Sequence, residues 1–145
     1  MRNTDLEKQY KALPLKERIA MSLSETIPEN YRLFLAQDQW NVIRCYFSRR
    51  VDLLETEIST LIEDDDYVVR LSVAKRDDLT PSQVEKCVVD TDPNVRHAIA
   101  RSTRLTNEQR TRLLNDADDL VQRSAKKGAR KAVHRQRDGQ AKLIK

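Results

Sequence analysis

A 26-residue internal period is the feature of this sequence that most constrains its fold. Residues 64–89 read DDDYVVRLSVAKRDDLTPSQVEKCVV, and residues 90–115 read DTDPNVRHAIARSTRLTNEQRTRLLN. Both segments open with two aspartates one residue apart, place Val-Arg at the same distance, and continue through small and apolar residues to Leu-Thr. A fixed period of this length is typical of repeat architectures, in which every unit is one supersecondary element.

The same period extends beyond these two segments without gaps. Residues that recur every 26 positions include the arginines Arg18, Arg44, Arg70 and Arg96, the aspartates Asp38, Asp64, Asp90 and Asp116, the apolar residues Met21, Phe47, Val73 and Ile99, and the small residues Ser22, Ser48, Ala74 and Ala100. We therefore divide residues 1–125 into units near 12–37, 38–63, 64–89 and 90–115, with a partial unit from 116. Residues 126–145 form a separate basic C-terminal cap or tail.

Each unit contains the signals of two short helices. In residues 90–115, Asp92 is an N-cap candidate directly before Pro93, a residue favoured at the first helical position. A second helix is predicted after Thr106, because Gln109 stands three residues later as in a capping box. A helical hairpin of this size cannot cover its own apolar face, so successive units must stack. The sequence thus predicts an all-α fold, an α-solenoid of four to five two-helix repeats of 26 residues.

The Asp-x-Asp-x-x-Val-Arg pattern of residues 64–80 and 90–106 resembles that of HEAT-like repeats, and the 26-residue length is similar to that of leucine-rich-repeat-variant units. The resemblance covers roughly residues 12–125 and implies the stacked helical fold. It also implies a scaffold for proteins or nucleic acids, since members of these families serve mainly in that role. The iron–sulfur variant of the family carries a cysteine cluster that this chain lacks, so we do not carry that cofactor over.

The arginines and aspartates that recur in every unit are interpreted as structural. Residues that every unit repeats serve what every unit needs, and an arginine of one unit can pair with an aspartate at the next turn while that aspartate also caps a helix. We predict such a ladder from Arg18, Arg44, Arg70, Arg96, Asp38, Asp64, Asp90 and Asp116. Positions where the repeat pattern breaks are better candidates for contact with other molecules.

Aromatic residues provide the clearest breaks in the pattern. All seven lie within the first 67 residues. Trp40 stands in a column that holds aspartate in three other units, and Tyr46 stands in a column of small residues. Because aromatic side chains are common anchors of protein interfaces, we select Trp40, Tyr46 and Tyr67 as candidate protein-binding residues. The alternative is that such residues belong to an N-terminal unit that packs differently.

Positive charge follows a different distribution. Residues 1–120 hold 18 Lys/Arg against 22 Asp/Glu, a net charge of −4, whereas residues 121–145 hold 9 Lys/Arg against one aspartate, a net charge of +8. A row of cations also recurs near the end of the first helix of each unit, where it could follow a phosphate backbone or simply complement helix dipoles. The candidate nucleic-acid-binding residues are Arg49, Arg50, Lys75, Arg76, Arg101, Lys127, Arg130, Lys131, Arg135 and Arg137.

Three interpretations of residues 126–145 stay open. The segment could be a polar cap that closes the solenoid, a basic arm for nucleic acid, or a partly disordered terminus. If it is helical, the helix begins near Ala129 and places Ala132 and Val133 on a thin apolar strip.

No catalytic motif stands out, and we expect a protein that is not an enzyme and holds no cofactor or metal. Cys45 and Cys87 stand alone, without metal-ligand spacing. No apolar run approaches the ~20 residues of a membrane span, so we expect a cytoplasmic protein without membrane partners. The preferred function is an adaptor that binds a protein partner through the helical-repeat surface, and the alternative is nucleic-acid binding through the basic row and tail. Compact size and a basic end would suit a bacterial or phage regulator.

Overall fold

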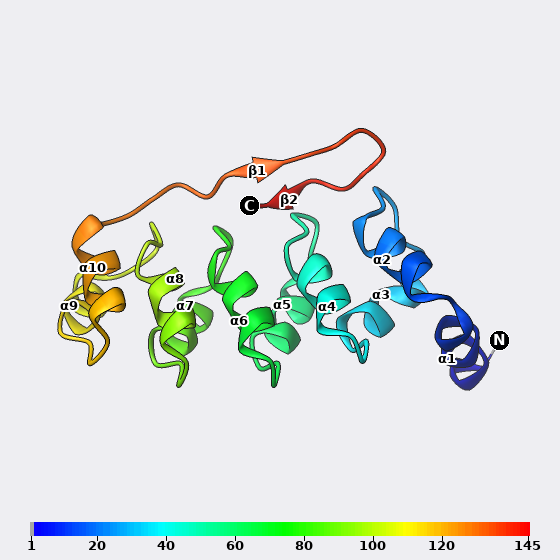
Figure 1. Ribbon diagram of the computed structural model, residues 1–145, viewed down its shortest axis with the longest axis horizontal. Helices are drawn as coiled ribbons and strands as arrows, with labels where there is room; N and C mark the ends of the chain where they lie inside the picture. The colour runs from blue at the N-terminus through cyan, green and yellow to red at the C-terminus, as the bar shows by residue number, and fades with distance from the viewer. Residues whose placement is uncertain (1) are drawn as a thin grey trace.

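The computed structural model describes residues 2–145, which form ten short helices and one two-stranded hairpin (Figure 1). The helices are α1 (Asn3–Ala12), α2 (Leu15–Leu23), α3 (Glu29–Ala36), α4 (Asn41–Ser48), α5 (Glu55–Leu61), α6 (Tyr67–Ala74), α7 (Pro81–Val88), α8 (Pro93–Ile99), α9 (Asn107–Leu114) and α10 (Asp119–Lys127). The strands are β1 (His134–Arg135) and β2 (Leu143–Ile144).

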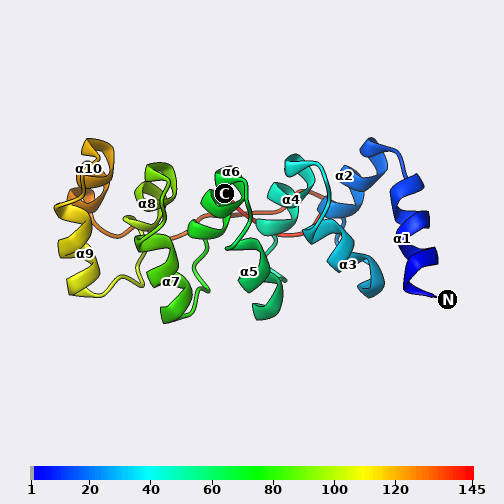
Figure 2. The ribbon, with the colours of Figure 1, turned by 90° about the horizontal axis from the view of Figure 1, so that it is seen from below.

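The helices stack in two rows, as the 26-residue period predicts. Helices α2, α4, α6, α8 and α10 form one row, and α3, α5, α7 and α9 form the other (Figure 2). The pairs α2/α3, α4/α5, α6/α7 and α8/α9 fall within the four predicted units, and α10 belongs to the partial fifth unit. The fold is therefore an α-helical repeat stack, and α1 packs against α3 at its N-terminal end.

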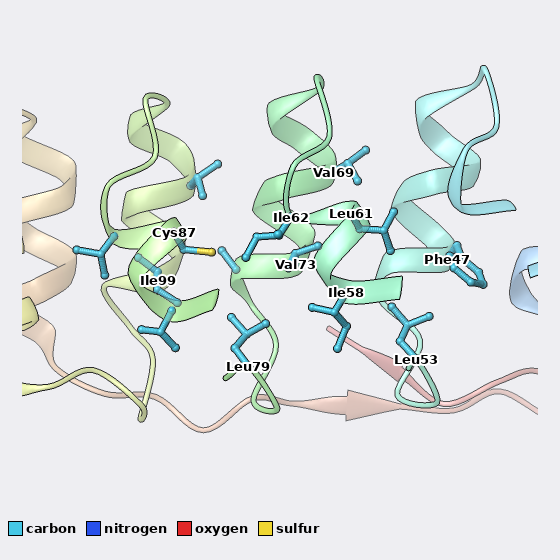
Figure 3. Close-up of a cluster of buried hydrophobic side chains, with 14 of the residues drawn as sticks. Phe47, Leu53, Ile58, Leu61, Ile62, Val69, Val73, Leu79, Cys87 and Ile99 are labelled. Atoms are coloured by element: carbon cyan, nitrogen blue, oxygen red, sulfur yellow. The ribbon is translucent and has the colours of Figure 1, made fainter. Parts of the chain in front are cut away.

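The apolar residues that recur every 26 positions form one continuous core between the rows (Figure 3). Phe47, Val73 and Ile99 have no exposed surface, and the same holds for Leu61 and Leu79. The small residues at Ser22, Ser48, Ala74 and Ala100 are also buried, where they let the even-numbered helices approach one another closely. Each unit thus covers the apolar face of its neighbour.

Helix starts differ between the two halves of the chain. From α6 to α10, every N-cap side chain accepts a backbone hydrogen bond; these residues are Asp66, Thr80, Asp92, Thr106 and Asp118. Gln83 and Gln109 complete capping boxes at α7 and α9, in agreement with the sequence. Within residues 2–54, by contrast, the N-cap positions of α1 to α5 receive no side-chain cap.

The C-terminal segment departs from the helix expected from Ala129. Residues 128–145 form an extended strap that leaves α10, runs back along the stack and turns near α2 (Figure 1). Gly128 and Gly139 have φ values of 76° and 72°, which favour glycine, and they lie where the strap begins and where it turns. The segment is thus neither a cap on the end of the stack nor a free arm.

Backbone hydrogen bonds attach the strap to the turns of three units. Arg130 N donates to Arg101 O over 2.8 Å, Ala141 N to Leu23 O over 2.9 Å, and Ile144 N to Arg49 O over 2.7 Å. The apolar residues Ala141, Leu143 and Ile144 are buried against these turns. The strap therefore ties together units that are remote in sequence.

We expect the strap to stabilise the stack. Ile144→Ala should lower the free energy of unfolding by about 2–4 kcal/mol, because it removes buried methyl groups and leaves a cavity. Val133→Ala, on an exposed part of the same strap, is the matched control and should change stability by less than about 0.5 kcal/mol. Urea denaturation of the two variants checks this expectation, and equal stability losses would contradict it.

Candidate binding surfaces

The stack has two edges of opposite character. The ladder edge comprises the turns from an odd-numbered helix to the next even-numbered one, at residues 37–40, 62–66, 89–92 and 115–118. The strap edge comprises the turns that follow the even-numbered helices, at residues 24–28, 49–54, 75–80 and 100–106. Figure 1 shows these edges at the bottom and the top of the molecule, with the strap along the top.

The repeated arginines and aspartates form the predicted ladder. Nε of Arg70 donates to Oδ2 of Asp90 over 2.9 Å, and its Nη2 donates to Oδ1 over 3.2 Å. The same two-pronged contact joins Arg44 to Asp64 and Arg96 to Asp116. Each of these pairs links one unit to the next.

Every rung also fixes the turns on both sides. Nη1 of Arg70 donates to the carbonyl oxygen of Asp64 in its own unit over 2.7 Å. Oδ1 of Asp90 accepts the backbone N–H of Asp92 over 2.8 Å. The charges are largely shielded from water, and hydrogen bonding to Asp90 raises the pKa of Arg70. The six residues of these three pairs are thus engaged in holding the turns.

The ladder changes at its two ends. Oδ2 of Asp38 accepts hydrogen bonds from Nη1 of Arg18 over 2.8 Å and from the hydroxyl of Tyr10 over 2.5 Å. Burial and this bond raise the pKa of Tyr10. At the other end Gln122 replaces arginine and donates only to the carbonyl oxygen of Asp116. The aromatic cluster of Tyr10, Tyr31 and Phe34 then covers the N-terminal end of the core.

Arg50 and Arg76, predicted as nucleic-acid-binding residues, lie in the interior of the strap edge. Their side chains have no exposed surface, so neither guanidinium can reach a phosphate from outside. Arg50 donates to both carboxylate oxygens of Asp52 and to the carbonyl oxygens of Ser22 and Ser24. A second structural ladder therefore lies at this edge.

Arg76 repeats this arrangement one unit later, with Asp78 and the carbonyl oxygens of Ser48 and Arg50. The signal in the sequence was the Arg-x-Asp triplet, which occurs at residues 50–52 and again 26 residues later. Its carboxylate could have identified both arginines as structural.

The other candidate cations lie on or near the strap. Nε of Arg49 donates to the carbonyl oxygen of Ile144 over 2.8 Å, so this guanidinium is already hydrogen-bonded to the strap. Lys75, Arg101, Arg130 and Lys131 line a common groove between the strap and helices α6 and α8. The remaining candidates are exposed at the end of α10 and along the hairpin, at Lys127, Arg135 and Arg137.

The candidate protein-binding aromatics separate into two kinds. Trp40 and Tyr67 are 47% and 41% exposed and lie on the ladder edge. Nδ2 of Asn41 donates to Oδ2 of Asp66 over 2.7 Å, which places the turns that carry Trp40 and Tyr67 side by side. Tyr46 is half-buried on α4, away from these turns.

Within residues 2–145, no three His, Cys, Asp or Glu side chains are grouped to hold a metal ion. No helix of that range has the length and apolar character needed to cross a membrane. Cys87 is buried, which raises its pKa to about 12 and keeps the thiol protonated at neutral pH.

Loss of one rung should destabilise the stack. Asp90→Asn should lower the free energy of unfolding by about 1.5–3 kcal/mol, because two hydrogen bonds from a charged donor lose their anionic acceptor. The exposed Asp65 makes no side-chain ion pair with an arginine of residues 2–145, and Asp65→Asn should change stability by less than about 0.5 kcal/mol. Urea denaturation at neutral pH compares the two, and equal effects would contradict a structural ladder.

The ladder should also make stability depend on acid. Burial alone would raise the pKa of Asp116, but hydrogen bonds from Arg96 and from the backbone of Asp118 outweigh it, so the pKa is lowered in the folded state. This stabilisation is present above the unfolded pKa of about 3.9 and is lost as the pH falls through the folded value. Unfolding measured between about pH 2 and 5 should show a weaker pH dependence for Asp116→Asn than for the original chain.

Comparison with known proteins assigns no family to this chain. Searches against family models, curated proteins and solved structures found no match.

Proposed function

We propose that this chain is a non-catalytic binding module that recognises a protein segment along the ladder edge, with Trp40 and Tyr67 as anchors. Both aromatic side chains are exposed, Trp40 in one turn of the ladder edge and Tyr67 at the start of α6, directly after the next turn. Large aromatic residues contribute strongly to interfaces because they bury much area at a small cost in conformational entropy. Trp40 supplies the main argument.

Trp40 occupies a position where aspartate would serve the fold better. Its φ and ψ of −91° and 117° match those of Asp66 (−88°, 118°) and Asp92 (−91°, 124°). Those two aspartates cap α6 and α8, whereas α4 has no side-chain cap. A missing cap costs about 0.5–2 kcal/mol. Residue 40 is nevertheless a tryptophan, and its indole ring is exposed to solvent. This loss of stability without a gain in packing supports a role in binding.

The charges around the aromatics suggest the chemistry of the partner. Asp65 is exposed beside them, and Asp66 is half-buried. Hydrogen bonds from the backbone N–H of Val68 and then from the amide of Asn41 lower the pKa of Asp66, so its carboxylate is ionised at neutral pH. Further along the same edge lie Asp92 and Asp118. A segment that carries both apolar and basic side chains would complement this surface.

Nucleic-acid binding is the second candidate, and the cations of the strap edge favour it. Lys75, Arg101, Arg130 and Lys131 have no carboxylate within ion-pair distance among the described residues. However, Arg50 and Arg76 are buried, and the strap occupies Arg49. The row expected from the sequence is therefore interrupted, and we prefer the protein-binding proposal.

Trp40→Asp separates stability from binding. The new carboxylate should accept the N–H of Val42, as Asp66 accepts that of Val68, and should raise the free energy of unfolding by about 0.5–2 kcal/mol. Partner affinity should nevertheless fall by about tenfold or more, equivalent to at least ~1.4 kcal/mol. The measurements are urea denaturation and titration of the purified partner, which is first recovered from nuclease-treated extract by affinity purification.

Leu33→Asp is the matched control for this substitution. Leu33 is 52% exposed on α3, outside the turns of the ladder edge, so its replacement should leave partner affinity unchanged. If Trp40→Asp binds as tightly as the original chain, Trp40 is not an anchor. If nuclease treatment removes all bound material, the nucleic-acid candidate is favoured instead.

A further inference from the structure

A groove on the strap edge combines positive charge with an apolar wall. It lies between α6, α8 and residues 130–133 of the strap, has a volume of about 520 Å³, and also receives Lys145. Backbone bonds from Arg130 to Arg101 and from Lys145 to Val133 hold its strap side in place. The groove lies at the opposite edge from Trp40, so it is independent of the proposed protein-binding surface.

Four cations surround this groove without an anionic partner. Among the described residues, no carboxylate lies within ion-pair distance of Lys75, Arg101, Arg130 or Lys131. Asp77 is the acidic residue that lines the groove, and its Oδ2 lies 3.1 Å from Nε2 of His134. On the ladder edge, by contrast, Arg44, Arg70 and Arg96 each face a carboxylate. Like charges gathered in this way repel one another, and a bound anion would relieve that repulsion.

The wall between the cations is apolar and is shaped for a compact ligand. Leu71 and Ala98 line it from the helices, and Ala132 and Val133 line it from the strap. The volume falls within the range of about 300–1,000 Å³ that is usual for small-molecule sites. The residues that line the groove come from two neighbouring helices, α6 and α8, from the turns that follow them, and from the strap. The volume favours a small ligand over a polymer.

We infer that this groove binds a small phosphate monoester that carries an apolar or planar group. Arginine and lysine together suit a phosphate, which offers several acceptor oxygens and a charge near −2 at neutral pH. The apolar wall would cover the remainder of the ligand. Since residues of the strap and of α6 and α8 all contribute, ligand binding should also stabilise the attached strap.

Calorimetric titration and thermal unfolding of the full chain test this inference with AMP, glucose 6-phosphate, inorganic phosphate and adenosine as probes. AMP should bind at one site per chain and raise the Tm. Glucose 6-phosphate, whose ring is polar and not planar, and inorganic phosphate should bind more weakly, and adenosine should not bind. Tighter binding of glucose 6-phosphate than of AMP would contradict the role of the apolar wall.

Two variants locate the binding site, and a third is their control. Arg101→Gln/Lys131→Gln should weaken phosphate-ester binding by about tenfold or more, because two charged donors are lost. Ala98→Tyr should abolish it by filling the groove; Tyr46 occupies the same repeat column in α4, so the fold can hold a ring there. Lys126→Gln/Arg137→Gln removes the same charge from exposed sites outside the groove and should bind like the original chain.

Three outcomes would overturn the inference. The first is that neither phosphate ester binds. The second is that the control variant loses as much affinity as Arg101→Gln/Lys131→Gln, which indicates attraction to net charge alone. The third is that a short single-stranded oligonucleotide binds while both phosphate esters fail, which assigns these cations to a nucleic-acid surface. None of these results bears on Trp40, so the proposed protein-binding function is tested separately.

Discussion

The fold depends on the fact that none of its units can be stable alone. Helices of seven to ten residues are too short to persist in water, where isolated helices shorter than about 12–15 residues are marginal. Each helical pair also leaves an apolar face that only the next pair covers. The Arg–Asp rungs act at the same boundaries, since each connects the turn of one unit with the turn of the next. Cohesion between neighbours therefore governs the repeat spacing, the core and the positions of the turns.

Cohesion of this kind explains why the repeat could be predicted from the sequence. The stacking columns, the capping residues Asp92 and Thr106 and the partners of the ladder all follow one period, so each unit repeats the evidence of the others. Trp40 was recognised by the opposite criterion, as a departure from a column of caps. Local and periodic information was sufficient for the repeat, whereas the binding role of Trp40 stays a prediction.

The strap could not be predicted in this way, because its contacts are neither local nor periodic. Arg49 and Ile144 are 95 residues apart in sequence and are joined by a side-chain bond to a carbonyl oxygen and by a backbone bond. Composition indicated a charged tail, and its many cations concealed the buried Leu143 and Ile144. The same non-local contacts decide which of the predicted cations remain accessible. Arg50 and Arg76 were misassigned because a cation in a basic row looks the same in sequence whether a carboxylate covers it or not.

The strap also changes what a repeat stack of this size can do. Open stacks change curvature easily, because each unit contacts only its neighbours. Here the turns at Leu23, Arg49 and Arg101 are joined to a single segment, so a change in curvature would break backbone hydrogen bonds at several units together. A stack held in one shape presents Trp40 and Tyr67 at fixed separation, which lowers the ordering cost of binding. If the proposed function is correct, the strap would favour recognition at the ladder edge, and the two edges could bind different ligands without competing for space.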